Sequence, residues 1–255
     1  MGRQQAVDST LRMLTCCLAV LFGSWAPLAT AVKAVAAPAP FHVYEVDAVT
    51  EHIGVFLNNR HGQRLGSFGR LRQHVVDGGW RLEFAMNGGI YQQGGAPLGL
   101  LVVDGRQLRS INRRTKAHGN FYLQPNGVFL MGERGPRIVR TEDYPPVDTK
   151  WVKQATQSGP LLVIDGKRNG QLPVGASLVR NGVGVRGSSV FFVVTDAGVT
   201  FHEFADFFVR VLHCTDALYL DGNISGAWRA NTIGVGNVSG SAFGPMIGVT
   251  SPVED

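Results

Sequence analysis

The apolar residues of this chain fall mostly in short runs with the two-residue period of β-strands. Residues 41–46 and 53–57 alternate apolar side chains with polar or small ones, which is typical of strands with one buried face. A continuous apolar run at residues 190–194 predicts a strand that is buried on both faces. The pattern therefore predicts a mainly β protein.

Turn signals between apolar segments predict three hairpins. Each pairs Asp or Asn with Gly, and such pairs favour the positive φ angles of two-residue hairpin turns. The predicted turns are Asp104-Gly105 within residues 98–108, Asn126-Gly127 within residues 121–131, and Asp165-Gly166 after residues 161–164.

One helix is well specified, from Thr200 to Leu212. Thr200 and Glu203 form a capping box, and apolar residues at helical spacing follow on one face, namely Phe204, Phe207, Phe208, Val211 and Leu212. The helix lies between the strands predicted at 190–194 and 217–220, an order that predicts a right-handed β-α-β unit with two parallel strands. The expected fold class is α+β or mixed α/β: a β-rich single domain with a mixed sheet and a few packed helices.

Two of the predicted strands end abruptly in small polar residues. Asn87 follows the apolar run that begins at Phe84, and Asp221 follows residues 217–220. A strand fixed in the core can hold a polar side chain still at the rim of its sheet. Asn87 and Asp221 are therefore the first candidate site residues.

The amino-terminal segment, residues 1–37, resembles a signal peptide. It has a basic start at Arg3 and Arg12, an apolar stretch at 13–22, and small residues suited to cleavage between 31 and 37. The alternative is an uncleaved membrane anchor. We expect export to the periplasm or beyond, without stable membrane insertion after processing, and one domain over residues 38–255.

Charge and cysteine content narrow the function further. The formal net charge of +5 falls to about +3 without residues 1–37, which hold three Lys or Arg and one Asp. The mature chain shows no basic stripe, so we expect no nucleic-acid partner. Cys214 is the only cysteine outside residues 1–37, which excludes an intrachain disulfide in the mature protein.

Four motifs in this order resemble those of the phosphodiester glycosidase family. They are Asn87-Gly88-Gly89-Ile90-Tyr91, Ser158-Gly159-Pro160, Arg180-Asn181-Gly182-Val183-Gly184 and Asp221-Gly222-Asn223-Ile224-Ser225. The resemblance covers residues 84–225 and extends toward residue 249. It implies hydrolysis of a sugar-1-phosphodiester by an exported bacterial branch of the family.

The chain departs from the family pattern at three positions. Asn181, Asn223 and Ile224 stand where the family has small residues. Ile224 is bulky at a glycine position, which implies a different sugar pocket.

The predicted catalytic residues are Asp221 and Arg180. The carboxylate of Asp221 would act on water or on the anomeric carbon, and the planar fork of Arg180 suits phosphate oxygens. The structural alternatives are a turn acceptor at Asp221 and a salt bridge at Arg180. Because a phosphate ester leaves more easily than an alcohol, one carboxylate and one arginine would suffice.

The predicted substrate-binding residues lie in or near the same motifs. They are Asn87, Gly88, Ser158, Gly159, Ser225 and His202.

We expect no metal site and no cofactor, because the seven histidines show no ligand spacing, although calcium bound by Asp and backbone oxygens stays open. The expected partner is a carbohydrate or phosphoglycan substrate, and the sequence leaves the oligomeric state open. The alternative function is an inactive exported glycan-binding or envelope-binding module on the same fold, since fold alone does not establish activity.

Overall fold

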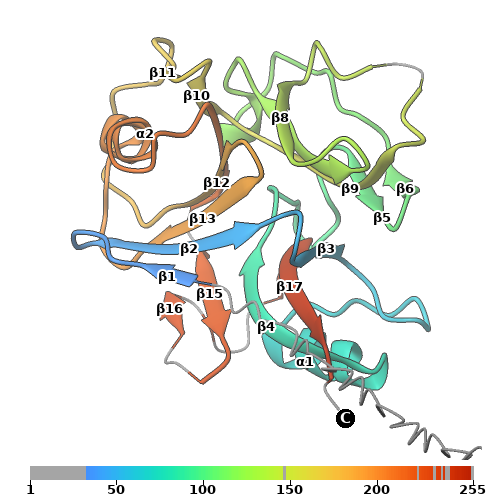
Figure 1. Cartoon of the computed structure of the whole chain (residues 1–255). Coiled ribbons are helices and arrows are strands. Elements are labelled where there is room, and N and C mark those ends of the chain that lie inside the picture. Colours follow the sequence, from blue (N-terminus) through green and yellow to red (C-terminus); the bar gives the residue numbers. More distant parts are fainter. Residues whose placement is uncertain are drawn as a thin grey trace, which may run out of the picture.

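The protein is built from three antiparallel β-sheets and two α-helices in its described part (Figure 1). The computed structural model describes residues 33–145, 148–222, 224–231, 234–236, 238 and 242–253. Within these residues no helix is long and apolar enough to cross a bilayer.

The largest sheet has seven strands in the order β1-β2-β13-β12-β14-β10-β11. It contains the strand that ends at Asp221. Its strands are β1 (Lys33–Val35), β2 (Phe41–Asp47), β10 (Leu161–Ile164), β11 (Lys167–Arg168), β12 (Asn181–Arg186), β13 (Ser189–Thr195) and β14 (Asp216–Asp221).

Two five-stranded sheets complete the described structure. The second sheet has the order β16-β15-β4-β17-β3, with β3 (His52–Phe56), β4 (Trp80–Asn87), β15 (Gly226–Arg229), β16 (Val235–Gly236) and β17 (Met246–Pro252). The third has the order β6-β5-β9-β7-β8, with β5 (Leu101–Val103), β6 (Arg106–Arg109), β7 (Gly127–Gly132), β8 (Arg137–Arg140) and β9 (Val152–Ser158).

The helix predicted from Thr200 to Leu212 is confirmed as α2 (Phe201–Arg210), with both hydrogen bonds of the capping box present. The helix ends two residues earlier than predicted, and Val211, which was placed on its apolar face, is exposed. Its apolar face packs on the seven-stranded sheet, where Phe204 and Phe208 are fully buried. A second helix, α1 (Phe68–Asp77), was not predicted. Ser67 caps α1 and its buried face is short, so its apolar signal is weaker than that of α2. A short 3-10 turn, η1, spans Asn120–Tyr122.

The prediction of a mixed sheet is wrong, because every strand pairing among the described residues is antiparallel. β13 and β14 do run in the same direction on either side of α2, but β12 lies between them and pairs with both. β12 and β13 form a tight hairpin through Gly187, whose φ is 59°, and α2 then carries the chain past β12. The β-α-β unit is therefore split by an inserted antiparallel strand.

Two of the three predicted hairpins are confirmed. Asp104-Gly105 joins β5 to β6, and Asp165-Gly166 joins β10 to β11, with positive φ at all four residues. The hairpin predicted around Asn126-Gly127 is wrong. The Asn126 side chain instead donates to the Phe121 carbonyl at 2.8 Å, and β7, which starts at Gly127, pairs with β8 and β9.

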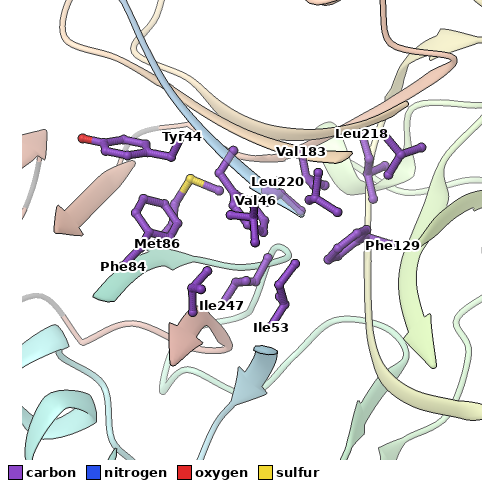
Figure 2. Close-up of a cluster of buried hydrophobic side chains, with 14 of the residues drawn as sticks. Tyr44, Val46, Ile53, Phe84, Met86, Phe129, Val183, Leu218, Leu220 and Ile247 are labelled. Atoms are coloured by element: carbon purple, nitrogen blue, oxygen red, sulfur yellow. The ribbon is translucent and has the colours of Figure 1, made fainter. Parts of the chain in front are cut away.

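The central hydrophobic cluster receives side chains from all three sheets (Figure 2). Val183, Leu218 and Leu220 come from the seven-stranded sheet, Met86 from the second and Phe129 from the third. The prediction that residues 190–194 are buried on both faces is confirmed, since alternate side chains of β13 enter this cluster and the one beneath α2. The core thus fixes the strands that end at the candidate site.

Most of the predicted signal peptide lies outside the described residues. Lys33–Val35, near its end, form β1 and pair with β2.

Candidate functional site

The ends of four strands meet at the residues singled out in the sequence. β4 ends at Asn87 and β14 at Asp221, while β12 begins at Asn181 and β15 at Gly226. Asn181 stands opposite Asp221 in the pairing of β12 with β14, and β15 pairs with β4. The site therefore lies where the seven-stranded sheet meets the second sheet.

Asn87 holds these strands together with a fully buried side chain. Its Oδ1 accepts hydrogen bonds from the Gly226 amide at 2.9 Å and from Asn181 Nδ2 at 3.0 Å. Its Nδ2 lies 3.5 Å from Asp221 Oδ2. Asn87 thus combines a structural role at the junction with a direct, long contact to the predicted catalytic carboxylate.

Asn181 is a site residue whose role the sequence did not reveal. Its Oδ1 accepts from the Asp221 amide at 2.7 Å, and its Nδ2 also donates to the Asn87 carbonyl at 2.9 Å. These bonds use both ends of the amide, so Asn181 links the two predicted site residues. The departure from a small family residue was the available signal.

Asp221 is a partly exposed carboxylate. Burial raises the pKa of Asp221 to about 6, and hydrogen bonds from the Gly222 amide and the Asn87 side chain oppose that rise. The Gly222 amide donates to Asp221 Oδ1 at 2.6 Å. A carboxyl group with this pKa can exchange a proton near neutral pH.

The two predicted serines lie next to Asp221 along the strand ends. Ser225 Oγ donates to the Asp221 carbonyl at 3.0 Å, and Ser158 Oγ donates to the Leu220 carbonyl at 2.8 Å. Both side chains are buried. In this structure they brace the end of β14.

The two predicted glycines permit close backbone approaches. The Gly88 amide donates to the Pro245 carbonyl at 2.8 Å, and a Cβ on Gly88 would lie 3.1 Å from that oxygen. A Cβ on Gly159 would lie 2.5 Å from the Asn126 Cβ. A larger residue at Gly159 would force its surroundings to shift, whereas Gly88 is tightly packed.

Arg180 lies deeper than the sequence suggested, with 2% of its surface exposed. Its Nε donates to the Val199 carbonyl at 2.7 Å and its Nη2 to the Ala176 carbonyl at 3.0 Å. The guanidinium carbon lies 3.7 Å from the centre of the Phe201 ring. The fork expected for phosphate oxygens is thus mostly occupied by backbone carbonyls.

Two tyrosines that the sequence did not single out lie within electrostatic reach of Asp221. Burial and then the Asp221 carboxylate raise the pKa of Tyr91 to about 12. Burial likewise raises the pKa of Tyr219 to about 12, with the Arg180 charge opposing and the Asp221 charge adding to that rise. Tyr219 lies two residues before Asp221 on β14, which was the signal available for it.

His202 and Ile224 occupy other surroundings. His202 Nε2 lies 3.2 Å from the Leu172 carbonyl, and no hydrogen bond between the described residues joins it to Asn87 or Asp221. Ile224 packs against the cluster beneath α1. Its bulk is thus accommodated by the second sheet.

The described residues contain no cluster of three or more His, Cys, Asp or Glu side chains suited to a metal ion. Cys214 is a buried free thiol, and burial raises its pKa to about 12. Five cavities of about 200–740 Å³ are lined by described residues other than Asn87, Arg180 and Asp221.

Comparisons with known proteins bear on the fold and the family of this chain. The chain is 33% identical over 185 residues to the uncharacterised Escherichia coli K12 protein YigE, and the aligned region covers 71% of each chain. The catalytic domain of zebrafish N-acetylglucosamine-1-phosphodiester alpha-N-acetylglucosaminidase shares the fold, with a TM-score of 0.54, 16% identity, and coverage of 82% of this chain and 76% of that one.

A hypothetical protein from Synechocystis has a similar fold, with a TM-score of 0.52 and 13% identity over 86% of this chain and 61% of its own. The phosphodiester glycosidase family profile matches residues 81–250, which include every strand end of the candidate site. The chain therefore belongs to the phosphodiester glycosidase family.

Proposed function

We propose that this protein is an exported hydrolase that cleaves a glycosyl-phosphodiester bond, with Asp221 as its catalytic carboxylate. The observation that carries the proposal is the contact between Asn87 and Asp221 at the junction of two sheets. A partly exposed carboxylate with a pKa of about 6, fixed by two buried asparagines, suits acid-base chemistry. Family membership supports a glycan-type substrate.

In the proposed reaction, the bond between the anomeric carbon and the ester oxygen breaks. The phosphate monoester departs with the electrons of that bond, and water supplies the new hydroxyl on the sugar. Ionised Asp221 accepts the proton of the water, or first attacks the anomeric carbon and is then released by water. Both routes give a free sugar and a phosphate monoester.

The leaving group explains why one carboxylate is enough. An alcohol needs a second carboxyl group as general acid, whereas a phosphate ester anion departs without full protonation. Positive charge near the departing phosphate would stabilise the transition state. Arg180 supplies a buried positive charge near this end of β14.

A screen of the purified mature protein against sugar-1-phosphodiesters, with release of reducing sugar as the readout, tests this proposal. N-acetylglucosamine-1-phosphodiesters are the first compounds to try, because the zebrafish enzyme is named for them. Asp221→Asn is the inactive control. Binding of these compounds without sugar release would favour the alternative, an inactive glycan-binding module.

A further inference from the structure

Arg180 leaves one hydrogen-bonding group unused in the interior of the protein. Its Nη1 is buried and has no hydrogen-bond partner among the described residues, and Arg180 takes part in none of the ion pairs found there. A buried charged donor without an acceptor is costly and points to a role outside packing.

Tyr219 lies between this charge and the candidate site. Its side chain is fully buried, and the Arg180 guanidinium carbon is 5.5 Å from the centre of its ring. Burial is the main cause of the raised pKa of Tyr219, while the positive charge of Arg180 lowers this pKa and the Asp221 carboxylate raises it further. The pKa of the Tyr219 phenol therefore depends on the charges of both predicted catalytic residues.

The phenol oxygen also contacts the rim itself. Asn120 Nδ2 lies 3.5 Å from the Tyr219 hydroxyl, and Asn120 is partly exposed. A Cβ on Gly222 would lie only 2.3 Å from the same hydroxyl, so a larger residue after Asp221 would displace the phenol. The Tyr219 hydroxyl therefore reaches from the buried arginine to the edge of the Asp221 site.

We propose that Tyr219 is a positioning residue that couples the buried charge of Arg180 to an anion bound beside Asn120 and Gly222. The anion is a phosphate group, and its assignment to the phosphate of the substrate rests on the proposed function. Asn120 contacts the anion directly, whereas Arg180 acts through the polarised phenol. The side chains of Arg180 and Tyr219 share a hydrogen bond that lowers the pKa of Tyr219. Hydrogen bonds in series strengthen one another in a low-dielectric interior, so the neutral hydroxyl can present part of the arginine charge at the rim.

The experiment is a calorimetric titration of the mature protein with inorganic phosphate at pH 7. Tyr219→Phe removes only the hydroxyl, and Arg180→Lys keeps the charge but alters its geometry. We expect each change to weaken phosphate binding about tenfold. The two residues act in series, so their effects should not multiply. The double variant should bind phosphate at most about twofold less tightly than whichever single variant has the lower affinity.

Tyr144→Phe is the matched control, since Tyr144 is a buried tyrosine of the third sheet's cluster. It should bind phosphate as the wild type does. If Arg180→Lys fails to fold, Asn120→Ala replaces it, because Asn120 is partly exposed and should lose phosphate affinity without loss of the fold. The proposal would be overturned if Tyr219→Phe or Asn120→Ala bound phosphate with wild-type affinity. It would also be overturned if the losses of affinity multiplied in the double variant, or if the wild type bound no phosphate.

Phosphate binding needs no turnover, so this test is separate from that of the proposed function. If phosphate binds and depends on both Tyr219 and Arg180, but no phosphodiester releases sugar, the inference holds and the proposed hydrolase function is wrong. Sugar release with full phosphate affinity in Tyr219→Phe would do the reverse.

Discussion

Asp221 is placed so that its protonation state changes near the pH at which an enzyme works. Its pKa of about 6 arises mainly from burial. If the ionised form acts, turnover should fall about tenfold per pH unit below pH 6 and reach a plateau above it. Asp221→Asn should lower kcat by about a hundredfold or more and leave KM within a few fold, because the amide preserves shape and most contacts.

The kinetic control is Asp143→Asn, because Asp143 carries an exposed carboxyl group in the turn after β8. Its pH profile should match that of the wild type. Full activity in Asp221→Asn would remove this residue from the mechanism.

The same carboxylate should cost stability. A carboxyl group whose pKa is higher in the folded than in the unfolded state favours folding at low pH, and this contribution is lost as the pH rises from about 4 to 6. Asp221→Asn avoids the burial of a charge, so it should be more stable than the wild type at pH 7 by on the order of 2 kcal/mol. The difference should vanish near pH 4.

Urea unfolding at the two pH values measures this effect, with Asp143→Asn as the reference. A destabilised Asp221→Asn at pH 7 would show that the ionised carboxylate is needed for the fold. The prediction that burial of the ionised Asp221 carboxylate lowers stability would then be wrong.

At the scale of elements, the capping box sets the start of α2. Thr200 Oγ1 accepts from the Glu203 amide at 3.2 Å, and a Glu203 side-chain oxygen accepts from the Thr200 amide at 2.8 Å. Thr200→Ala should therefore lower the free energy of unfolding by about 1 kcal/mol. Ser188→Ala, in the exposed turn between β12 and β13, is the control, and equal unfolding midpoints for the two variants would argue against the cap.

Elements were predictable where the signal is local. The capping box and apolar face of α2 and the turns at Asp104-Gly105 and Asp165-Gly166 depend on neighbouring residues only. The Asn126-Gly127 turn failed because long-range strand pairing decided it: β7 starts at Gly127 and pairs with β8 and β9. The insertion of β12 between β13 and β14 is likewise a matter of topology, which local patterns do not encode.

The same division applies to the candidate site. Asn87 and Asp221 were visible because polar residues at the ends of apolar strands stand out. Asn181, Tyr219 and Asn120 were not, because their roles depend on side chains that are distant in the sequence. Arg180 was visible as a residue, while its burial against Phe201 and two carbonyls was not.

At the scale of the whole molecule, the predicted export has a structural consequence at β1. Cleavage before Lys33 would keep this edge strand, whereas cleavage after Ala36 would remove it from β2. Intact-mass measurement of the protein from a bacterial periplasmic fraction should give a new amino terminus between residues 31 and 40. Full-length chain in the cytosol would contradict the prediction of export.

The most direct test of the proposed hydrolase is the position of bond cleavage. The mature protein is incubated with a sugar-1-phosphodiester in water enriched in oxygen-18, and the products are weighed by mass spectrometry, with Asp221→Asn alongside. The account predicts that the label enters the sugar at its anomeric carbon, that the phosphate monoester stays unlabelled, and that Asp221→Asn yields little of either product. Label in the phosphate, or equal product from Asp221→Asn, would contradict a glycosidase that works through Asp221.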